Sequence, residues 1–263
     1  PGFKGSANAT RSVDPKSATG THWYIRAVVA ASNDFGATAV STSSLGPVSG
    51  TSAFNYGLLA YYRLDDDGSE NVSLLDATGH GYTLTNYNST GLGIGKIDGC
   101  ASFNASSNNY LSNSGNDISI NGGDFSVSLW VNPSDISGYT NMFCSPGYLA
   151  IHSNGSGGGI DVNNTYAGSD ISTSENLSVG SWSHLVVICE SGTTSLYVDG
   201  SFVASTTQVL GIVGKQNIGF DEFDPSRYFS GLIDEVGIWS RALNEAEISA
   251  LYNSGDGLSF SAF

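Results

Sequence analysis

Short runs of strand-forming residues, separated by turns rich in Gly, Ser and Asn, recur from Leu58 to Tyr252. The run FSVSLWVNP alternates apolar and other side chains, so one face of its strand carries Phe125, Val127, Leu129 and Val131. SHLVVICE indicates a strand that is covered on both faces. TSLYVDGSFVAST predicts a hairpin whose Asp199-Gly200 pair forms a type I′ turn. Many antiparallel strands in series predict an all-β fold, an antiparallel β-sandwich of the jelly-roll type.

Composition narrows the class of protein further. The chain of 263 residues is 40% hydrophobic, enough to bury the core of one large β domain. Charged residues are scarce and uncharged polar residues abundant, which favours a location outside the cell, at a cell surface or on a virion. The formal net charge of -15 and the lack of a basic stripe argue against nucleic acid as a partner. No apolar run is long enough for membrane insertion.

The three cysteines, Cys100, Cys144 and Cys189, cannot all pair within one chain. Buried free thiols are the favoured interpretation, and Cys189 lies in the apolar run HLVVIC. A disulfide between Cys144 and one of the others is the alternative for an oxidising compartment.

The N-terminal residues differ in pattern from the rest of the chain. Residues 1–20 are polar and aperiodic, which predicts an extended arm, and residues 21–50 predict a β-hairpin. Its WYIRAVVAASNDFG resembles the last two strands of a fibronectin type III module. A hairpin alone is marginal in water, so it is expected to pack on a neighbour or to belong to a longer module. An ordinary surface hairpin is the alternative.

One helix is expected after the last strand, followed by a tail over residues 256–263. Asn244 is a typical N-cap residue, and Glu247 completes a capping box three positions later. Ile248, Leu251 and Tyr252 form an apolar stripe, and Gly255 predicts the end of the helix. Because so short a helix is unstable alone, its stripe is expected to pack on the sandwich.

Several segments in order resemble the laminin-G-like domains of the concanavalin A-like lectin/glucanase superfamily. They are GLLAYYRLDDDGSENVSLLDATGHGYTLT, GCASFNASSNNYL, FSVSLWVNP, GSWSHLVVICESGTTSLYVDGSFVAST, QNIGF and FSGLIDEVGIWSRALNEAEISALY. The resemblance covers residues 57–255 and implies a concanavalin A-like jelly roll. It says little about function, because members of this superfamily include carbohydrate-binding modules, adhesion domains, virion proteins and some glycosidases.

A catalytic function is not expected. Glycosidases of the superfamily carry Glu-x-Asp-x-x-Glu on one strand, whereas DEFDPS offers only Glu222 and Asp224, and Pro225 interrupts the strand. His184 invites comparison with a nucleophilic triad. The resemblance instead implies a packed, hydrogen-bonded histidine at the start of this strand.

A structural Ca²⁺ ion is a possible cofactor, since Ca²⁺ takes six to eight oxygens from carboxylates and carbonyls in turns. Asp65 and Asp76 lie in the acidic opening segment. The resemblance implies that the first and last strands are neighbours, which would bring Asp234 close to Asp65. The alternative is that Asp234 and Glu235 cap backbone groups or pair with Arg63 or Arg241.

The leading prediction is a non-catalytic binding or adhesion module that recognises glycans or a protein on a cell or virion surface. Sugar binding needs exposed aromatic rings, amides and carboxylates on loops held by a sheet. The candidates are Tyr139, Asn141, His152, Asn154, Asp221, Arg227 and Tyr228. The alternative is a structural assembly protein, such as a virion fibre or decoration subunit or a filament subunit, that forms a homo-oligomer or docks on neighbours through its N-terminal arm and hairpin.

Overall fold

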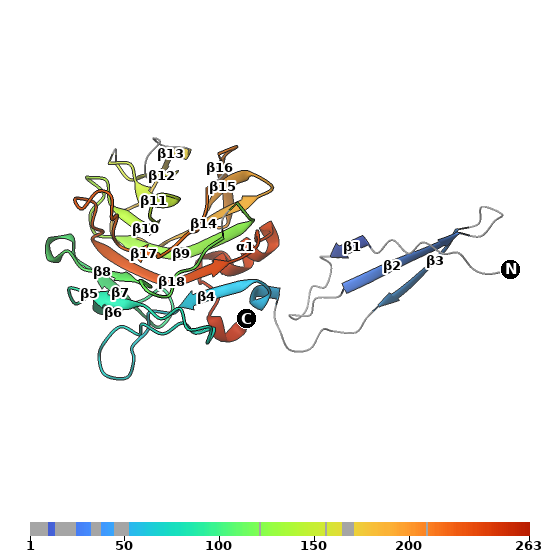
Figure 1. Cartoon of the computed structure of the whole chain (residues 1–263), viewed down its shortest axis with the longest axis horizontal. Coiled ribbons are helices and arrows are strands. Elements are labelled where there is room, and N and C mark those ends of the chain that lie inside the picture. The colour runs from blue at the N-terminus through green and yellow to red at the C-terminus, as the bar shows by residue number, and fades with distance from the viewer. Residues whose placement is uncertain are drawn as a thin grey trace. The chain divides into compact units, whose positions relative to one another are not determined.

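The computed structural model describes residues 10–13, 25–32, 38–44, 53–120, 122–155, 157–164, 171–208 and 210–263. By their contacts, residues 1–53 and residues 54–263 form two separate compact units (Figure 1). The first unit contains a three-stranded antiparallel sheet in the order β1-β2-β3. Its strands are β1 (Thr10–Val13), β2 (Ile25–Ser32) and β3 (Thr38–Ser44).

Strands β2 and β3 pair antiparallel within the predicted hairpin, and β1 lies within residues predicted as an extended arm. The remaining residues of that arm and the hairpin's turn lie outside the described residues. The likeness to a fibronectin type III module stays a prediction.

The second unit is a sandwich of two antiparallel sheets, which confirms the predicted fold class (Figure 1). The seven-stranded sheet runs in the order β13 (Ile171–Asn176), β12 (Gly159–Asn163), β11 (Leu149–Ser153), β10 (Asn141–Ser145), β17 (Asn217–Ile218), β8 (Tyr110–Ser112) and β5 (Thr85–Tyr87). The eight-stranded sheet runs β16 (Ser201–Thr206), β15 (Thr193–Val198), β14 (Ser183–Glu190), β9 (Phe125–Pro133), β18 (Gly231–Trp239), β7 (Gly99–Phe103) and β6 (Gly91–Ile94), and β4 (Leu58–Tyr62) also pairs with β18.

The main core lies between the two sheets and follows the predicted alternation. Phe125, Val127, Leu129 and Val131 of β9 are fully buried in it. From the opposing sheet, β11 contributes Leu149 and Ile151. Because strand side chains alternate between faces, the intervening residues of each strand lie on the outer face of their sheet.

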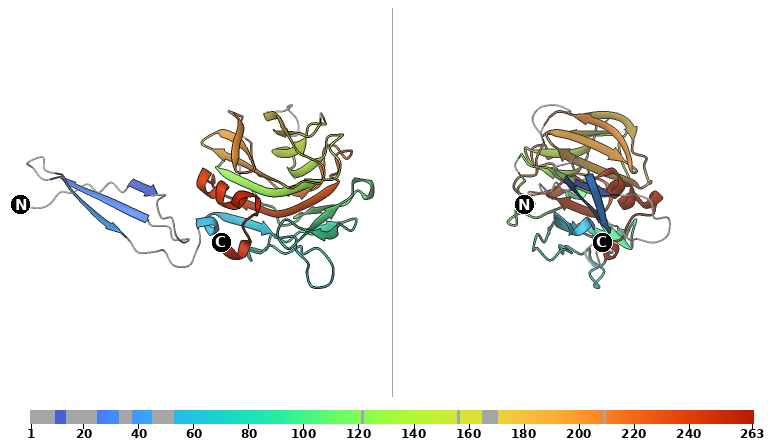
Figure 2. Two further views of the ribbon diagram at one scale, coloured as in Figure 1. Left: turned by 180° about the vertical axis from the view of Figure 1, so that it is seen from behind. Right: turned by 90° about the vertical axis from the view of Figure 1, so that its right-hand side faces the viewer.

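Helix α1 (Glu245–Tyr252) lies against the eight-stranded sheet, as the view from behind shows (Figure 2). Its buried Ile248 and Leu251 join a second apolar cluster with Tyr61 and Trp239. The helix therefore packs its apolar side chains on the sandwich, as predicted. Short 3-10 turns occur at Ala53–Asn55, Ala105–Ser107, Asn253–Gly255 and Phe260–Ala262.

The predicted N-terminal cap of α1 is confirmed, whereas the predicted C-terminal end of the helix is wrong. The Asn244 side chain accepts from the Glu247 N–H, and the Glu247 side chain accepts from the Asn244 N–H, which is the predicted capping box. The helix ends earlier than Gly255, because Asn253 adopts the left-handed conformation (φ 49°) and forms the C-cap. Asn is the residue after Gly that best tolerates this conformation.

Two further sequence predictions can be checked directly. Asp199 and Gly200 both have positive φ (49° and 76°), as the predicted type I′ turn requires. Cys100, Cys144 and Cys189 are all buried free thiols. No helix in the described part of the chain has the length and hydropathy needed to cross a membrane.

Candidate functional site

A row of polar side chains crosses the outer face of the seven-stranded sheet. Asn141 of β10 pairs with His152 of β11, His152 with Asp161 of β12, and Asp161 with Ser172 of β13. Since directly paired residues lie on the same face, these four residues form one row. Ile151 and Val162, their neighbours along β11 and β12, face the core. The alternation therefore places the polar row opposite the core.

His152 is held as a neutral imidazole within this row. Its Nδ1 lies 2.9 Å from the Ser153 carbonyl oxygen, and its Nε2 lies 2.9 Å from the Asn163 side-chain nitrogen. The carbonyl can only accept and the amide nitrogen can only donate, so Nδ1 carries the proton and Nε2 accepts. Burial lowers the pKa of His152, which favours the same neutral form. Both ring nitrogens are thus already used within the protein.

Asn141 stands out because its amide is buried without a partner. The residue is 0% exposed, and neither Oδ1 nor Nδ2 makes a hydrogen bond to the described residues. A buried polar group without a partner costs about 1–3 kcal/mol, so water or a ligand is expected to satisfy it. The backbone N–H of Asn141 donates to the Arg227 carbonyl oxygen, 3.1 Å away.

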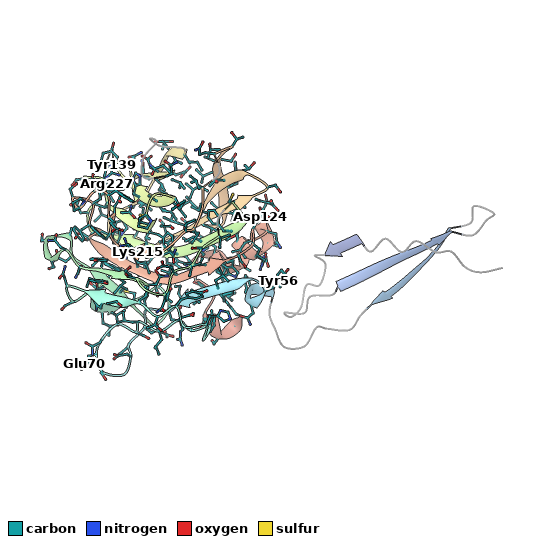
Figure 3. All side chains as sticks on the ribbon, viewed as in Figure 1. Tyr56, Glu70, Asp124, Tyr139, Lys215 and Arg227 are labelled. Atoms are coloured by element: carbon teal, nitrogen blue, oxygen red, sulfur yellow. The ribbon has the colours of Figure 1, made fainter. Side chains whose placement is uncertain are left out.

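Tyr139 and Arg227 lie side by side over this end of the sheet (Figure 3). The Arg227 guanidinium carbon is 4.9 Å from the centre of the Tyr139 ring, which lies 6.0 Å from the His152 ring. Tyr139 is 51% exposed, so its ring offers apolar surface to solvent. Arg227 Nε is 2.9 Å from Asp224, and its Nη1 is 3.9 Å from the buried Asp221. Five of the seven predicted ligand-binding residues therefore meet in one place.

The other two candidates lie beside this group. Tyr228 belongs to a stack of rings in which Tyr87–Tyr110, Tyr110–Phe220 and Phe220–Tyr228 are separated by 4.5, 4.6 and 4.5 Å. Because Tyr87 and Tyr110 come from β5 and β8, the stack fixes the loop between β17 and β18 to the sheet. Asn154 lies in the β11–β12 turn, where its side-chain nitrogen is 3.4 Å from the Thr173 carbonyl oxygen.

Asp161 and Asn163 belong to this site although neither was predicted as a ligand-binding residue. Both lie in IDVN, where Ile160 and Val162 face the core. This alternation of apolar and polar residues was the available signal, because it places both polar side chains on one face.

The three predicted metal ligands perform separate structural roles. Asp76 accepts hydrogen bonds from the backbone N–H groups of Tyr61, Thr78, Gly81 and Tyr82. Asp65 and Asp234 instead meet at the β6–β7 turn. Asp234 Oδ2 accepts from the N–H groups of Lys96 and Ile97, and Asp65 Oδ1 accepts from that of Gly99.

The backbone contacts of Asp234 agree with the alternative in which this residue caps backbone groups, while Arg63 pairs with Asp65, 2.6 Å away. Within the described residues, no group of three or more acidic, His or Cys side chains is arranged to hold a metal ion. Both oxygens of Asp76 accept backbone hydrogen bonds from its own loop. Calcium at Asp65, Asp76 and Asp234 stays a prediction.

Glu235, the residue after Asp234, has a buried carboxyl group. It is 2% exposed, has a φ of 50°, and neither side-chain oxygen makes a hydrogen bond of good geometry to the described residues. Burial raises the pKa of both Glu235 and Asp234. Nearby, a cavity of about 610 Å³ is lined in part by Arg63, Asp65 and Asp98.

The residues considered for catalysis have structural contacts. Glu222 pairs with Lys215 at 2.9 Å, while Asp224 accepts from Ser226 and Arg227. The hydrogen bond from the Ser226 side chain is the main reason why the pKa of Asp224 is lowered, whereas a general acid needs a raised one. His184 is buried, with Nε2 2.8 Å from the Ser128 hydroxyl, and burial lowers its pKa to about 3. It stays a neutral, packed residue.

Several solved structures share this architecture. Domain 4 of AbnA, a GH43 extracellular arabinanase from Geobacillus stearothermophilus solved with arabinotriose, is 23% identical, with a TM-score of 0.59 over 73% of this chain and 96% of that one. The binding domain of Paraclostridial Mosquitocidal Protein 1 is 17% identical, with a TM-score of 0.59 over 76% of this chain. The botulinum neurotoxin serotype D binding domain is 16% identical, with a TM-score of 0.54 over 76% of this chain.

This chain covers about half of each of these two toxin domains, 52% in both cases. At these identities the likeness shows the fold alone. No curated protein sequence matches the chain. The family model Laminin_G_3, described as the concanavalin A-like lectin/glucanases superfamily, matches residues 104–249, more than half of the chain. Because the family model matches more than half of the chain and the fold is a two-sheet sandwich, the chain belongs to the laminin-G-like group of the concanavalin A-like lectin/glucanase superfamily.

Proposed function

We propose that the domain formed by residues 54–263 is a non-catalytic glycan-binding module, acting outside a cell or on a cell or virion surface. Its ligand would lie on the outer face of the seven-stranded sheet, between Tyr139, Arg227 and the polar row. The exposed ring of Tyr139, which packs against Arg227 and lies 6.0 Å from the His152 ring, carries this proposal. An exposed aromatic ring beside polar side chains is a surface on which the apolar face of a sugar can stack.

The surroundings of Asn141 support the same interpretation. The exposed Tyr139 ring can stack on the apolar face of a sugar, and the buried carboxylate of Asp221 can accept from hydroxyl groups. The stack from Tyr87 to Tyr228 holds the overlying loop in place, so little conformational freedom would be lost on binding. Two relatives of known structure are named as binding domains, and a third was solved with arabinotriose.

A glycan array followed by calorimetric titration of the best ligand tests the proposal. Tyr139→Ala removes the exposed ring and is expected to weaken binding by about 1–3 kcal/mol, a loss of roughly 5- to 150-fold. Phe202→Ala removes a comparably exposed ring (55%) from β16 of the other sheet and is the matched control. Failure to bind any glycan, or equal losses in both variants, would contradict the proposal.

The alternative function, assembly through the N-terminal residues, has one observation in its favour. Residues 1–53 form a compact unit separate from the sandwich, and their small sheet contains only three strands among the described residues. Sheets this small commonly gain stability by packing on another surface. Mass measurements on the complete chain and on a variant lacking residues 1–50 distinguish the two functions.

A further inference from the structure

We infer that the outer-face site selects uncharged glycans and rejects those that carry carboxylate or sulfate groups. This inference rests on the proposed function, because it names the class of glycan that the same site would bind. It depends on the charges around Asn141, which come from β12 and from the loop between β17 and β18.

The acidic groups at this site outnumber the basic ones. Asp161 comes from β12, and Asp221 and Asp224 come from the overlying loop. Arg227 is the cation that faces them among the described residues, because Lys215 is paired with Glu222. His152 adds no charge, since its hydrogen bonds require the neutral ring. The site therefore holds three carboxylates and one guanidinium group, and two of the carboxylates lie beside that guanidinium.

Arg227 is poorly placed to receive an anion. Its Nε donates to Asp224 at 2.9 Å, its Nη1 lies 3.9 Å from Asp221, and the guanidinium packs over the Tyr139 ring. Arginine recognises a carboxylate best when two of its N–H groups can point at it together. Here Asp224 holds Nε, and Asp221 lies 3.9 Å from Nη1. An acidic sugar at this guanidinium would therefore lie beside two protein carboxylates.

Burial strengthens the resulting repulsion. Asp221 and Asp161 are 2% and 3% exposed, so their charges are poorly screened by water and salt. The formal net charge of the chain, -15, adds a long-range field of the same sign. A neutral sugar meets neither penalty, and its hydroxyls donate to carboxylates favourably.

Calorimetric titration of the complete chain with matched neutral and acidic oligosaccharides tests this inference. Suitable pairs are lactose with sialyllactose and xylotriose with glucuronic acid-substituted xylotriose. For the pair whose neutral member binds, the acidic member is expected to bind at least about tenfold more weakly at low ionic strength. Added salt is expected to narrow the gap.

Two isosteric variants connect the selectivity to its cause. Asp221→Asn and Asp161→Asn each remove one negative charge and are expected to reduce the difference between neutral and acidic ligands by about threefold or more. Glu190→Gln removes one charge from the exposed end of β14, on the other sheet, and is expected to leave the difference unchanged. Melting curves establish that each variant is folded.

The outcomes separate the two claims. Equal or tighter binding of an acidic ligand that depends on Tyr139 would overturn the selectivity and leave the glycan-binding function standing. An unchanged difference in both Asp variants would also overturn it, because the selectivity would then have another source. Binding to no oligosaccharide of either kind, on the array or in solution, would overturn both.

Discussion

Glu235 shows how a single residue can give this domain a pH-dependent stability. Burial raises the pKa of its carboxyl group in the folded state, so the folded protein holds the proton at a higher pH than the unfolded chain. As the pH rises above the unfolded value of about 4.3, the folded state must either keep the proton or ionise a buried group. The free energy of unfolding therefore falls as the pH rises towards the folded pKa.

We predict that Glu235→Gln removes part of this pH dependence. At pH 8 the variant is expected to be more stable than the wild type by about 1–2 kcal/mol, and near pH 4 the two should be nearly equal. Denaturant unfolding over this pH range, in the presence of a chelator, measures the difference. A constant difference between the two proteins at all pH values would contradict the prediction.

The role of His184 could be inferred from the sequence. The environment of Asn141 could not. The resemblance implied a packed histidine. The His184 ring lies 5.0 Å from the Trp130 ring, and its Nε2 is hydrogen-bonded to the Ser128 hydroxyl. Asn141 could be chosen as a polar loop residue. Its buried amide without a partner depends on strands distant in sequence and had no local signal.

Capping residues determine where helix α1 begins, and packing on the eight-stranded sheet stabilises it. Asn244 closes the capping box, and Arg241 pairs with Glu247 at 2.8 Å, which fixes the side chain that completes the box. We predict that Asn244→Ala lowers the free energy of unfolding by about 1 kcal/mol, or the melting temperature by roughly 2–4 °C. Asn244→Ser keeps a capping oxygen and should stay close to the wild type. Equal losses in both variants would mean that the cap does not stabilise the fold.

The β6–β7 turn is the element at which calcium can be tested. Asp65 and Asp234 both hold this turn, and Glu235 brings a third carboxyl group close to Asp65. The calcium prediction requires that a chelator lowers the melting temperature, that added Ca²⁺ restores it, and that Asp65→Asn removes the difference. Identical melting curves with chelator and with Ca²⁺ would show that the carboxylates stabilise the turn without an ion.

Strands and caps followed from neighbouring residues, whereas their exact ends and the hydrogen-bond partners of the acidic residues did not. The alternation in FSVSLWVNP and the Asp199-Gly200 turn need only local information. Gly255 was expected to end the helix, but Asn253 took the left-handed conformation first. Asp76 was chosen for its place in an acidic turn, and only the structure reveals that its oxygens hold the loop it belongs to.

At the scale of the whole molecule, the sandwich is expected to act independently of the N-terminal unit. We predict that deletion of residues 1–50 leaves the affinity for glycans and the melting temperature of the sandwich unchanged, because residues 54–263 contain both sheets and the second apolar cluster. Light scattering on both chains reports their mass. A stable oligomer that is lost on deletion would favour the assembly function instead.

The overall fold could be predicted because the family segments occur in order along the chain, whereas the site is formed by long-range pairing. Tyr139 precedes β10 and Arg227 follows β17, and the two strands pair through Phe143 and Ile218. That pairing, together with the aromatic stack, brings the two side chains within contact (Figure 3). A list of candidate residues was therefore possible from the sequence, and their arrangement was not.

The most direct test of the glycan-binding function is a crystal structure of the complete chain with the best neutral oligosaccharide from the array. We predict that the sugar contacts the Tyr139 ring beside Arg227 and that it lies on the outer face of the seven-stranded sheet. A ligand bound on the eight-stranded sheet, or in the acidic cavity beside Arg63 and Asp98, would contradict the proposed site.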